Sequence, residues 1–244
     1  MTYVIAEAGV DHEGSMERAL KLLDGATGAK ADCFKIQYYA EGFRGAHRVL
    51  PWLSPSQVVM LKEACDEQGI DFLVTPHDEW ALEFITDDLD MHRIKLGSND
   101  WHLLDAVILL GSEIELIIST GYLPYNSIVR TAERLDEKGI KADILHCVPK
   151  YPCPANEARL WSIEGLRASV KRVMDNPHGI GYSDHTRGSA IPLAAAALGA
   201  TVIEKHMTLE RDIDGRNDTT CSLLPEEWPP FVQGIRDIEQ AFAP

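Results

Sequence analysis

Cysteine is scarce in this 244-residue chain, acidic residues outnumber basic ones, and no long apolar run is present. The five cysteines are odd in number and show no CxxC spacing, so a reducing cytoplasm is the expected setting. No apolar stretch approaches the roughly 20 residues of a membrane span, and Met1-Thr2-Tyr3 leads straight into an expected strand without a signal peptide. The formal net charge of -15 predicts no nucleic-acid and no membrane partner, because both surfaces would repel the chain.

The remaining composition predicts an α/β protein. Hydrophobic residues make up 45% of the chain, which is enough for a substantial core and for one domain over 1–244. Strands are expected over 3–9, 33–39, 71–77, 93–98, 115–120, 143–148, 179–183 and 201–207. Helices are expected over 15–29, 54–68, 79–86, 103–110, 125–138, 156–174, 189–198 and 225–241. Eight strand–helix units with short loops describe a single (β/α)8 TIM barrel more economically than an open sheet.

Polar side chains share one face of these expected strands. In a barrel one face of each strand points toward the axis, and ligands bind at the carboxyl ends of the strands. The inward set comprises Glu7, Lys35, Gln37, Thr75, His77, Lys95, Ser119, Ser183, His185, Glu204 and His206, with Ser98 and Tyr151 just beyond their strand ends. Buried charges are costly unless they pair or meet a ligand, so the set predicts a binding site at the barrel mouth.

The residue types suggest two kinds of ligand. The ammonium groups of Lys35 and Lys95 suit a phosphorylated, carboxylated small molecule, together with the hydroxyls of Thr75, Ser98, Ser119 and Ser183. His185 and His206 could hold one divalent metal with positions open for substrate and water.

A structural reading competes for each residue, since a single strand-end histidine or lysine is commonly only hydrogen bonded or paired. Six or more inward polar residues in one layer, however, serve no packing purpose. His12, His77 and His146 fit either reading, and Cys147 and Cys153 are interpreted as packing or loop residues.

Nine motifs together resemble the N-acetylneuraminate (sialic acid) synthase family, and they cover nearly the whole chain in order. They are Glu7-Ala8-Gly9-Val10-Asp11-His12-Glu13-Gly14, Phe34-Lys35-Ile36-Gln37, Thr75-Pro76, Lys95-Leu96-Gly97-Ser98, Ser119-Thr120-Gly121, Leu145-His146-Cys147, Tyr151-Pro152, Gly181-Tyr182-Ser183-Asp184-His185-Thr186 and Glu204-Lys205-His206-Met207-Thr208. The resemblance implies a metal-dependent condensation of phosphoenolpyruvate with an aldehyde sugar, giving a 2-keto-3-deoxy acid in a TIM barrel.

The resemblance also implies residue roles. Phosphoenolpyruvate would be contacted by Lys35, Thr75, Lys95, Ser98, Ser119, Ser183 and His185, and the metal by His185 and His206. The sugar or the reacting water would be contacted by Glu7, Gln37, Tyr151 and Asp218, with Glu204 beside the substrate. Glu7 is the candidate for handling the proton of that water. Two histidines with substrate oxygens favour manganese and tolerate magnesium or cobalt.

Three departures from the family pattern bear on the acceptor. Pro149 replaces a hydrogen-bonding residue, the loop between Tyr39 and Ser54 is short, and the chain ends at Pro244 without a C-terminal antifreeze-like domain. A smaller or differently decorated aldehyde than N-acetylmannosamine is therefore expected, or a partner subunit that completes the site, and a homodimer stays open. Two other functions also stay open: a metal-dependent aldolase or lyase acting on a keto acid without phosphoenolpyruvate, and a non-catalytic ligand-binding subunit.

Overall fold

The computed structural model describes residues 1–44, 50–174 and 179–243. Its strands are β1 (Tyr3–Gly9), β2 (Cys33–Tyr38), β3 (Asp71–Pro76), β4 (Arg93–Leu96), β5 (Glu115–Ser119), β6 (Lys141–Cys147), β7 (Gly179–Asp184) and β8 (Val202–His206). Its α-helices are α1 (Met16–Gly28), α2 (Pro55–Gln68), α3 (Glu79–Glu83), α4 (Leu104–Leu110), α5 (Tyr125–Glu137), α6 (Trp161–Val170), α7 (Ala190–Ala197) and α8 (Trp228–Phe242). The expected short loop after Tyr39 includes 45–49, which lie outside the described residues, so that expectation stays a prediction.

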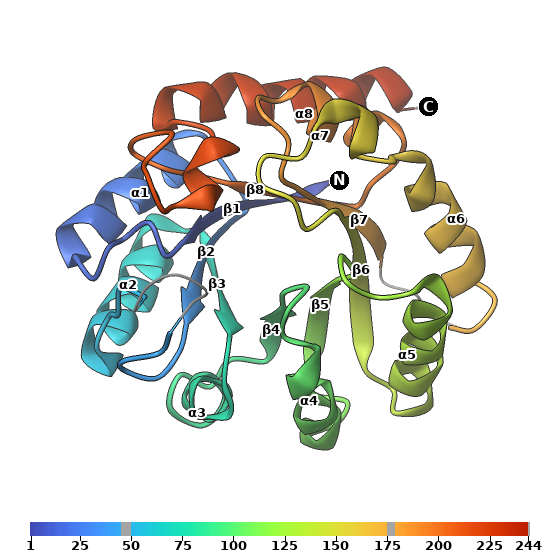
Figure 1. The fold of residues 1–244 in the computed structure, drawn as a ribbon, viewed down its shortest axis with the longest axis horizontal. Helices are drawn as coiled ribbons and strands as arrows, with labels where there is room; N and C mark the ends of the chain where they lie inside the picture. The colour runs from blue at the N-terminus through green and yellow to red at the C-terminus, as the bar shows by residue number, and fades with distance from the viewer. Residues whose placement is uncertain (45–49, 175–178, 244) are drawn as a thin grey trace.

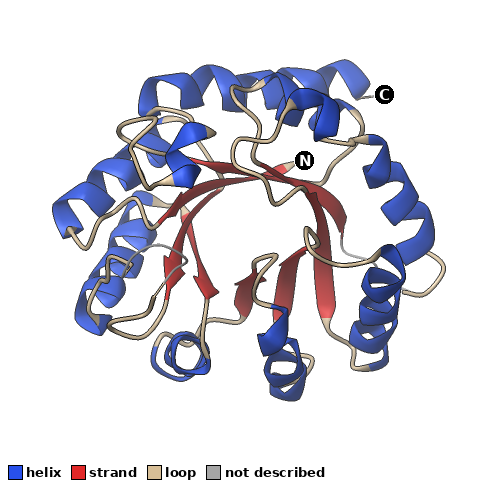
Figure 2. Cartoon of the chain, viewed as in Figure 1, coloured by secondary structure: helices blue, strands red, loops and turns tan. Residues whose placement is uncertain are grey.

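The eight strands form one parallel sheet in the order β3-β2-β1-β8-β7-β6-β5-β4. Figure 1 shows the sheet curling around a central axis with the helices outside it, and Figure 2 shows the same two layers as red strands within blue helices. The predicted TIM barrel is confirmed. The barrel has one seam, because β3 and β4 share no hydrogen-bonded ladder within the described ranges.

Alternation along the strands separates two layers of side chains. The outward residues of the strands, such as Phe34, Ile36 and Ile94, pack against the helices in one continuous core. The inward residues at the start of the strands fill the barrel with a smaller apolar cluster, which consists of Ile5, Cys33, Leu73, Ile117, Leu145 and Val202. Two residues further along the same faces, the inward side chains become charged or hydroxylated, except on β6, where Cys147 follows Leu145. The apolar cluster therefore forms the floor beneath the polar layer.

Local signals explain most helix boundaries, and two expected helices are corrected. Ser54 and Gln57 form a capping box at the start of α2, in which each side chain accepts a hydrogen bond from the backbone N–H of the other residue. Gly69 ends α2 in a left-handed conformation. The helix expected over 156–174 is wrong at its start: Arg159 has φ of 51°, so a short 3-10 turn precedes α6. The helix expected over 79–86 is α-helical only in α3 and continues as a π-helix at Phe84–Asp88. No helix within the described ranges is both long and apolar enough to span a membrane.

Candidate active site

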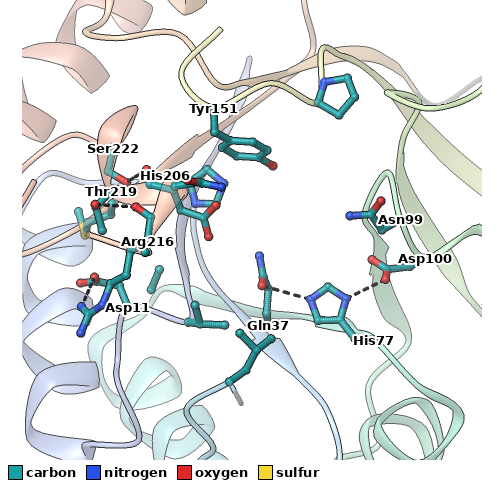
Figure 3. A pocket seen from close by; sticks show the side chains of 18 of the residues that line it. Asp11, Gln37, His77, Asn99, Asp100, Tyr151, His206, Arg216, Thr219 and Ser222 are labelled. Carbon is teal, nitrogen blue, oxygen red and sulfur yellow. Dashed lines mark hydrogen bonds and ion pairs between the residues drawn. The ribbon is translucent and has the colours of Figure 1, made fainter. Parts of the chain in front are cut away.

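Two adjacent cavities that share several lining residues occupy the barrel mouth. The inner one has a volume of about 80 Å³ and is lined by the predicted residues Glu7, Lys35, Gln37, Thr75, Lys95, Ser98, Ser119, Tyr151, Ser183, His185, Glu204 and His206. The outer one has a volume of about 600 Å³ and contains the remaining predicted residue, Asp218. Gln37, Tyr151 and His206 line both cavities, and Figure 3 shows them around the opening. The structure thus brings together the whole predicted set, although the role of each residue stays a prediction.

Strand register places Lys35 beside two carboxylates. Lys35 lies opposite Glu7 in the β1–β2 ladder, and its ammonium forms an ion pair with Glu7 Oε2. Lys35 Nζ also donates to Thr75 Oγ1 at 2.8 Å and lies 3.6 Å from Glu204 Oε2. Burial lowers the pKa of Lys35, but the charges of Glu204 and Glu7 outweigh it and raise the pKa. Lys35 is therefore a compensated, permanently charged group at the base of the chamber.

Lys95 is less well compensated than Lys35. Its ammonium donates to Ser119 Oγ at 2.8 Å and to the Leu96 carbonyl at 3.1 Å, and its nearest carboxylate oxygen, Glu204 Oε1, is 3.7 Å away. Burial lowers the pKa of Lys95, and the positive charge of Lys35 lowers it further against the attraction of Glu204. A ligand anion in the chamber would supply the charge that Lys95 lacks.

The two buried carboxyl groups of the chamber differ in electrostatic environment. Burial raises the pKa of Glu7 against the opposing charge of Lys35. Burial also acts on Glu204, but Lys35 and Lys95 outweigh it and hold the pKa of Glu204 at about 2. Ser183 Oγ donates to Glu204 Oε1 at 2.9 Å. Glu7 Oε2 meets the Lys35 ammonium, whereas Glu204 Oε2 has no hydrogen-bond partner within the described chain. Glu204 therefore stays ionised, while Glu7 is the carboxyl group more able to take up a proton.

The imidazoles of His185 and His206 lie next to each other, with ring centroids 5.6 Å apart. His185 Nδ1 lies 2.8 Å from the Val148 carbonyl, which leaves Nε2 for another partner. Burial would lower the pKa of His185, but Cys147 and the Val148 carbonyl outweigh it and raise the pKa. Burial lowers the pKa of His206 to about 4, so that ring is neutral at pH 7. Tyr151 packs on His185 with centroids 3.9 Å apart.

A hydrogen-bonded chain crosses the wall between the two cavities. Gln37 Nε2 donates to Glu7 Oε1 at 3.2 Å, and Gln37 Oε1 lies 3.1 Å from His77 Nε2. His77 Nδ1 lies 2.7 Å from Asp100 Oδ1, and Figure 3 shows the bonds from Gln37 to Asp100. Gly9 has φ of +56°, and a Cβ there would lie 3.2 Å from Glu7 Oε1 and 3.4 Å from Gln37 Nε2. Glycine thus leaves the space that this pair occupies.

The outer cavity is acidic among its described lining residues. Asp11, Glu13, Asp100 and Asp218 contribute carboxylates, and Arg216 contributes a guanidinium. Arg216 pairs with Glu13 at 2.7 Å and with Asp11 at 3.6 Å, which joins the loop after β8 to the loop after β1. Its positive charge is therefore already neutralised by protein carboxylates.

Several predictions need correction or extension. Cys147 is not simply a packing residue, because it lines the inner chamber with Sγ 3.8 Å from His185 Nδ1. Its inward position follows from the same alternation that turns Leu145 toward the axis, a signal that the sequence contained. His146 is structural, since Nε2 bonds the Ala158 carbonyl at 2.8 Å, and His12 accepts a hydrogen bond from the Gly14 backbone. Loop residues that the sequence reading missed are Asp11, Glu13, Asn99, Asp100, His102, Tyr122 and Arg216.

The protein is a TIM barrel, and a chamber lined by charged residues and imidazoles lies at the carboxyl ends of its strands. A chamber of this kind is typical of a small-molecule site. The chain belongs to the NeuB family, whose model matches residues 46–243. The family recognised from the nine motifs is thereby confirmed.

Relatives and a solved structure agree with this assignment. The N-acetylneuraminate-9-phosphate synthase of Drosophila melanogaster is 32% identical over 99% of this chain and 69% of its own length. The N,N'-diacetyllegionaminic acid synthase of Campylobacter jejuni is 32% identical over 98% of this chain and 77% of its own length. The crystal structure of N-acetylneuraminic acid (sialic acid) synthetase from Leptospira borgpetersenii in complex with citrate superposes with a TM-score of 0.88, at 31% identity. The match covers 100% of this chain and 85% of the chain of the Leptospira structure.

Proposed function

We propose that the protein condenses phosphoenolpyruvate with an aldehyde sugar to give a 2-keto-3-deoxy acid and inorganic phosphate. The observation that carries the proposal is the inner chamber, where two buried lysines and the hydroxyls of three serines and one threonine lie beside two adjacent imidazoles. Family relatives named as synthases of N-acetylneuraminate 9-phosphate and diacetyllegionaminic acid support this class of reaction.

The phosphoenolpyruvate end of the site is built from Lys35 and Lys95. Each ammonium already donates to a hydroxyl on the neighbouring strand, Thr75 for Lys35 and Ser119 for Lys95, so both are oriented before ligand binds. A phosphate and a carboxylate bring the negative charge that a buried ammonium such as Lys95 needs. A neutral keto sugar or an uncharged aldehyde alone would leave the charge of Lys95 poorly compensated.

His185 and His206 fit a divalent metal such as manganese, with magnesium or cobalt as alternatives. His206 is neutral, and the Val148 bond turns His185 Nε2 toward other partners, as a metal-binding imidazole requires. No group of three or more His, Cys, Asp or Glu side chains in the described ranges is arranged to hold a metal, so substrate or water oxygens would complete the coordination. A bound cation of this kind would act as a Lewis acid on the aldehyde oxygen.

The protein's own residues then have separable tasks. The lysines orient phosphoenolpyruvate so that its enol carbon attacks the aldehyde carbon, and they offset the phosphate charge as the new carbon–carbon bond forms. Water adds to the resulting cationic carbon before phosphate leaves. Glu7, whose pKa burial raises, accepts the proton of that water, and Gln37 holds the carboxyl group in place. Glu204 stays ionised and stabilises the two ammonium groups.

The proposal is tested by measuring phosphate release from phosphoenolpyruvate with a divalent metal and a panel of aldoses, followed by mass spectrometry of the products. Phosphate release that depends on the aldehyde, with a product equal in mass to aldehyde plus pyruvate, is the expected result. Cleavage or formation of a keto acid without phosphoenolpyruvate would instead indicate an aldolase or lyase. Tight binding of phosphoenolpyruvate without turnover of any aldehyde would indicate a ligand-binding subunit.

A further inference from the structure

His77 stands at the boundary between the two cavities and directly follows β3. Its side chain is 18% exposed, and both of its ring nitrogens have partners: Asp100 Oδ1 at 2.7 Å on Nδ1 and Gln37 Oε1 at 3.1 Å on Nε2. Its ring also lies nearly parallel to those of Tyr39 and Phe43, at interplanar angles of 20° and 18°. The position and the plane of the imidazole are therefore fixed from three sides.

Asp100 holds the Nδ1 side of the His77 ring, and Gln37 holds the Nε2 side. Burial raises the pKa of Asp100, but the hydrogen bond and charge of His77 outweigh it and lower the pKa, so Asp100 is an acceptor. Asp100 Oδ2 is itself held by the Gly97 backbone N–H at 2.9 Å. His77 Nδ1 must then donate to Asp100. The Gln37 oxygen lies 3.1 Å from Nε2, so the second ring nitrogen of His77 is engaged as well.

His77 Nε2 and Glu7 Oε1 contact opposite ends of the Gln37 amide. With its oxygen toward His77, the amide presents its NH2 group to Glu7 Oε1, where it donates at 3.2 Å. Rotation of the amide by half a turn would place its oxygen against Glu7 Oε1, and two acceptors would then face each other unless the carboxyl group carried a proton. His77 thus holds the oxygen end of the amide, opposite the NH2 group that meets Glu7.

The same bonds join strands across the seam of the barrel. Gln37 lies on β2, His77 follows β3, and Asp100 follows β4, while β3 and β4 share no ladder within the described ranges. His77 therefore has two separable effects: it bridges the seam, and it orients the amide that holds Glu7. The first effect predicts a loss of stability on mutation, and the second predicts a loss of turnover.

We propose that His77 is a positioning residue of the reaction centre, which binds Asp100 and Gln37 at once and so fixes the Gln37 amide in the orientation that holds Glu7. This inference rests on the proposed function, because Glu7 is there the group that handles the proton of the attacking water. His77 itself touches neither that water nor phosphoenolpyruvate in this scheme. Its contribution is the geometry of the Gln37–Glu7 pair.

The test replaces His77 with alanine and supplies small bases through the outer cavity. His77→Ala is expected to lower kcat roughly 10- to 100-fold, with less than about a threefold change in the KM for phosphoenolpyruvate. Added imidazole should restore a large part of kcat, because it offers two ring nitrogens to Asp100 and Gln37. 1-Methylimidazole should not, because its methylated nitrogen cannot form the second bond. Equal rescue by both bases, or a wild-type kcat without either, would overturn the proposal.

A second measurement separates this inference from the proposed function. Hydrogen exchange of the Gln37 side-chain amide, followed by NMR, should be at least about tenfold faster in His77→Phe, which keeps the ring stack and loses both bonds. His92→Ala is the matched control, since His92 is exposed at the other end of the barrel, and it should leave both exchange and kcat unchanged. Unchanged exchange in His77→Phe would refute the positioning role. If the wild-type protein consumed phosphoenolpyruvate with no aldehyde, the proposed function would fail while the exchange result still decided the role of His77.

Discussion

Replacing Lys95 with methionine should weaken phosphoenolpyruvate binding without weakening the fold of the free protein. Lys95 is 1% exposed, and among the described residues its ammonium has only neutral atoms within hydrogen-bond distance, namely Ser119 Oγ and the Leu96 carbonyl. Methionine preserves the length of the side chain and removes a buried charge, a change that costs little stability. In this variant Glu204 still has the Lys35 ammonium at 3.6 Å and the hydrogen bond from the Ser183 hydroxyl, so no buried carboxylate loses all of its partners.

The expected loss of affinity can be worked out from one charge-assisted hydrogen bond. Such a bond contributes about 1.5–3 kcal/mol, which corresponds to a roughly 10- to 150-fold weaker Kd for phosphoenolpyruvate. At a ligand concentration of about 100 times the wild-type Kd, the ligand stabilises the wild-type protein by about 2.7 kcal/mol. A variant that binds 100-fold more weakly gains only about 0.4 kcal/mol under the same conditions. Titration calorimetry and the Tm shift on adding phosphoenolpyruvate and a divalent metal measure both quantities.

Lys205 supplies the matched control for this prediction. It is also completely buried, but its ammonium pairs with Asp184 at 2.6 Å, and it does not line the inner chamber. Lys205→Met leaves Asp184 as a buried charge without its cation, which should cost about 3–5 kcal/mol of stability and lower Tm by roughly 6–20 °C. An unchanged Kd in Lys95→Met would refute the placement of Lys95 at the ligand anion. A fall in the Tm of the ligand-free Lys95→Met protein comparable to that of Lys205→Met would refute the electrostatic reasoning.

Three further predictions concern the metal, the acceptor and pH. His206→Ala should abolish stabilisation by divalent metal and phosphate release, while its Tm in EDTA stays within a few degrees of wild type; full activity would remove His206 from the metal site. The described lining of the outer cavity is acidic and should repel a phosphorylated acceptor. The kcat/KM for a neutral aldose should therefore be at least about tenfold higher than that for the phosphorylated form of the same sugar. A preference for the phosphorylated form in competition assays would contradict this. Burial lowers the pKa of His12 from 6.5 to about 4, so the unfolded chain binds a proton in that window before the folded one does. Stability should therefore fall as pH drops from 6.5 to 4, by up to about 3 kcal/mol from His12, and denaturant titrations of His12→Asn should show a shallower fall.

The inner layer of the site was predictable because alternation along a strand has a fixed period. Once Lys35 is assigned inward, Gln37 must share its face, and parallel register brings the corresponding residues of other strands to the same height. The same rule applied to β6 would have assigned Cys147 to the chamber. Strand positions are in this sense readable from sequence.

The outer layer was not predictable by the same reasoning. Arg216 meets Asp11 and Glu13 across about 200 residues of sequence, and no local period relates a loop after β8 to a loop after β1. Asp100 likewise comes close to His77 only through the closure of the barrel. The break before α6 occurs at Arg159, whose backbone adopts the left-handed conformation. Because this residue is neither glycine nor proline, the sequence contains no signal for the break.

The polar layer is both the candidate site and part of what connects the strands at the barrel mouth. Lys35 bonds from β2 to Thr75 on β3, Lys95 bonds from β4 to Ser119 on β5, and Ser183 bonds from β7 to Glu204 on β8. These bonds connect neighbouring strands in the absence of ligand, yet every one of them involves a charge that an apolar residue could replace at lower cost.

A barrel selected for stability alone would continue its apolar floor upward through this layer. Replacing the inward charges together should therefore raise the Tm of the free protein while removing phosphoenolpyruvate binding. Four buried charged residues, Glu7, Lys35, Lys95 and Glu204, surround one small chamber. Packing of the fold does not require these charges, and their presence is therefore an argument for a charged ligand.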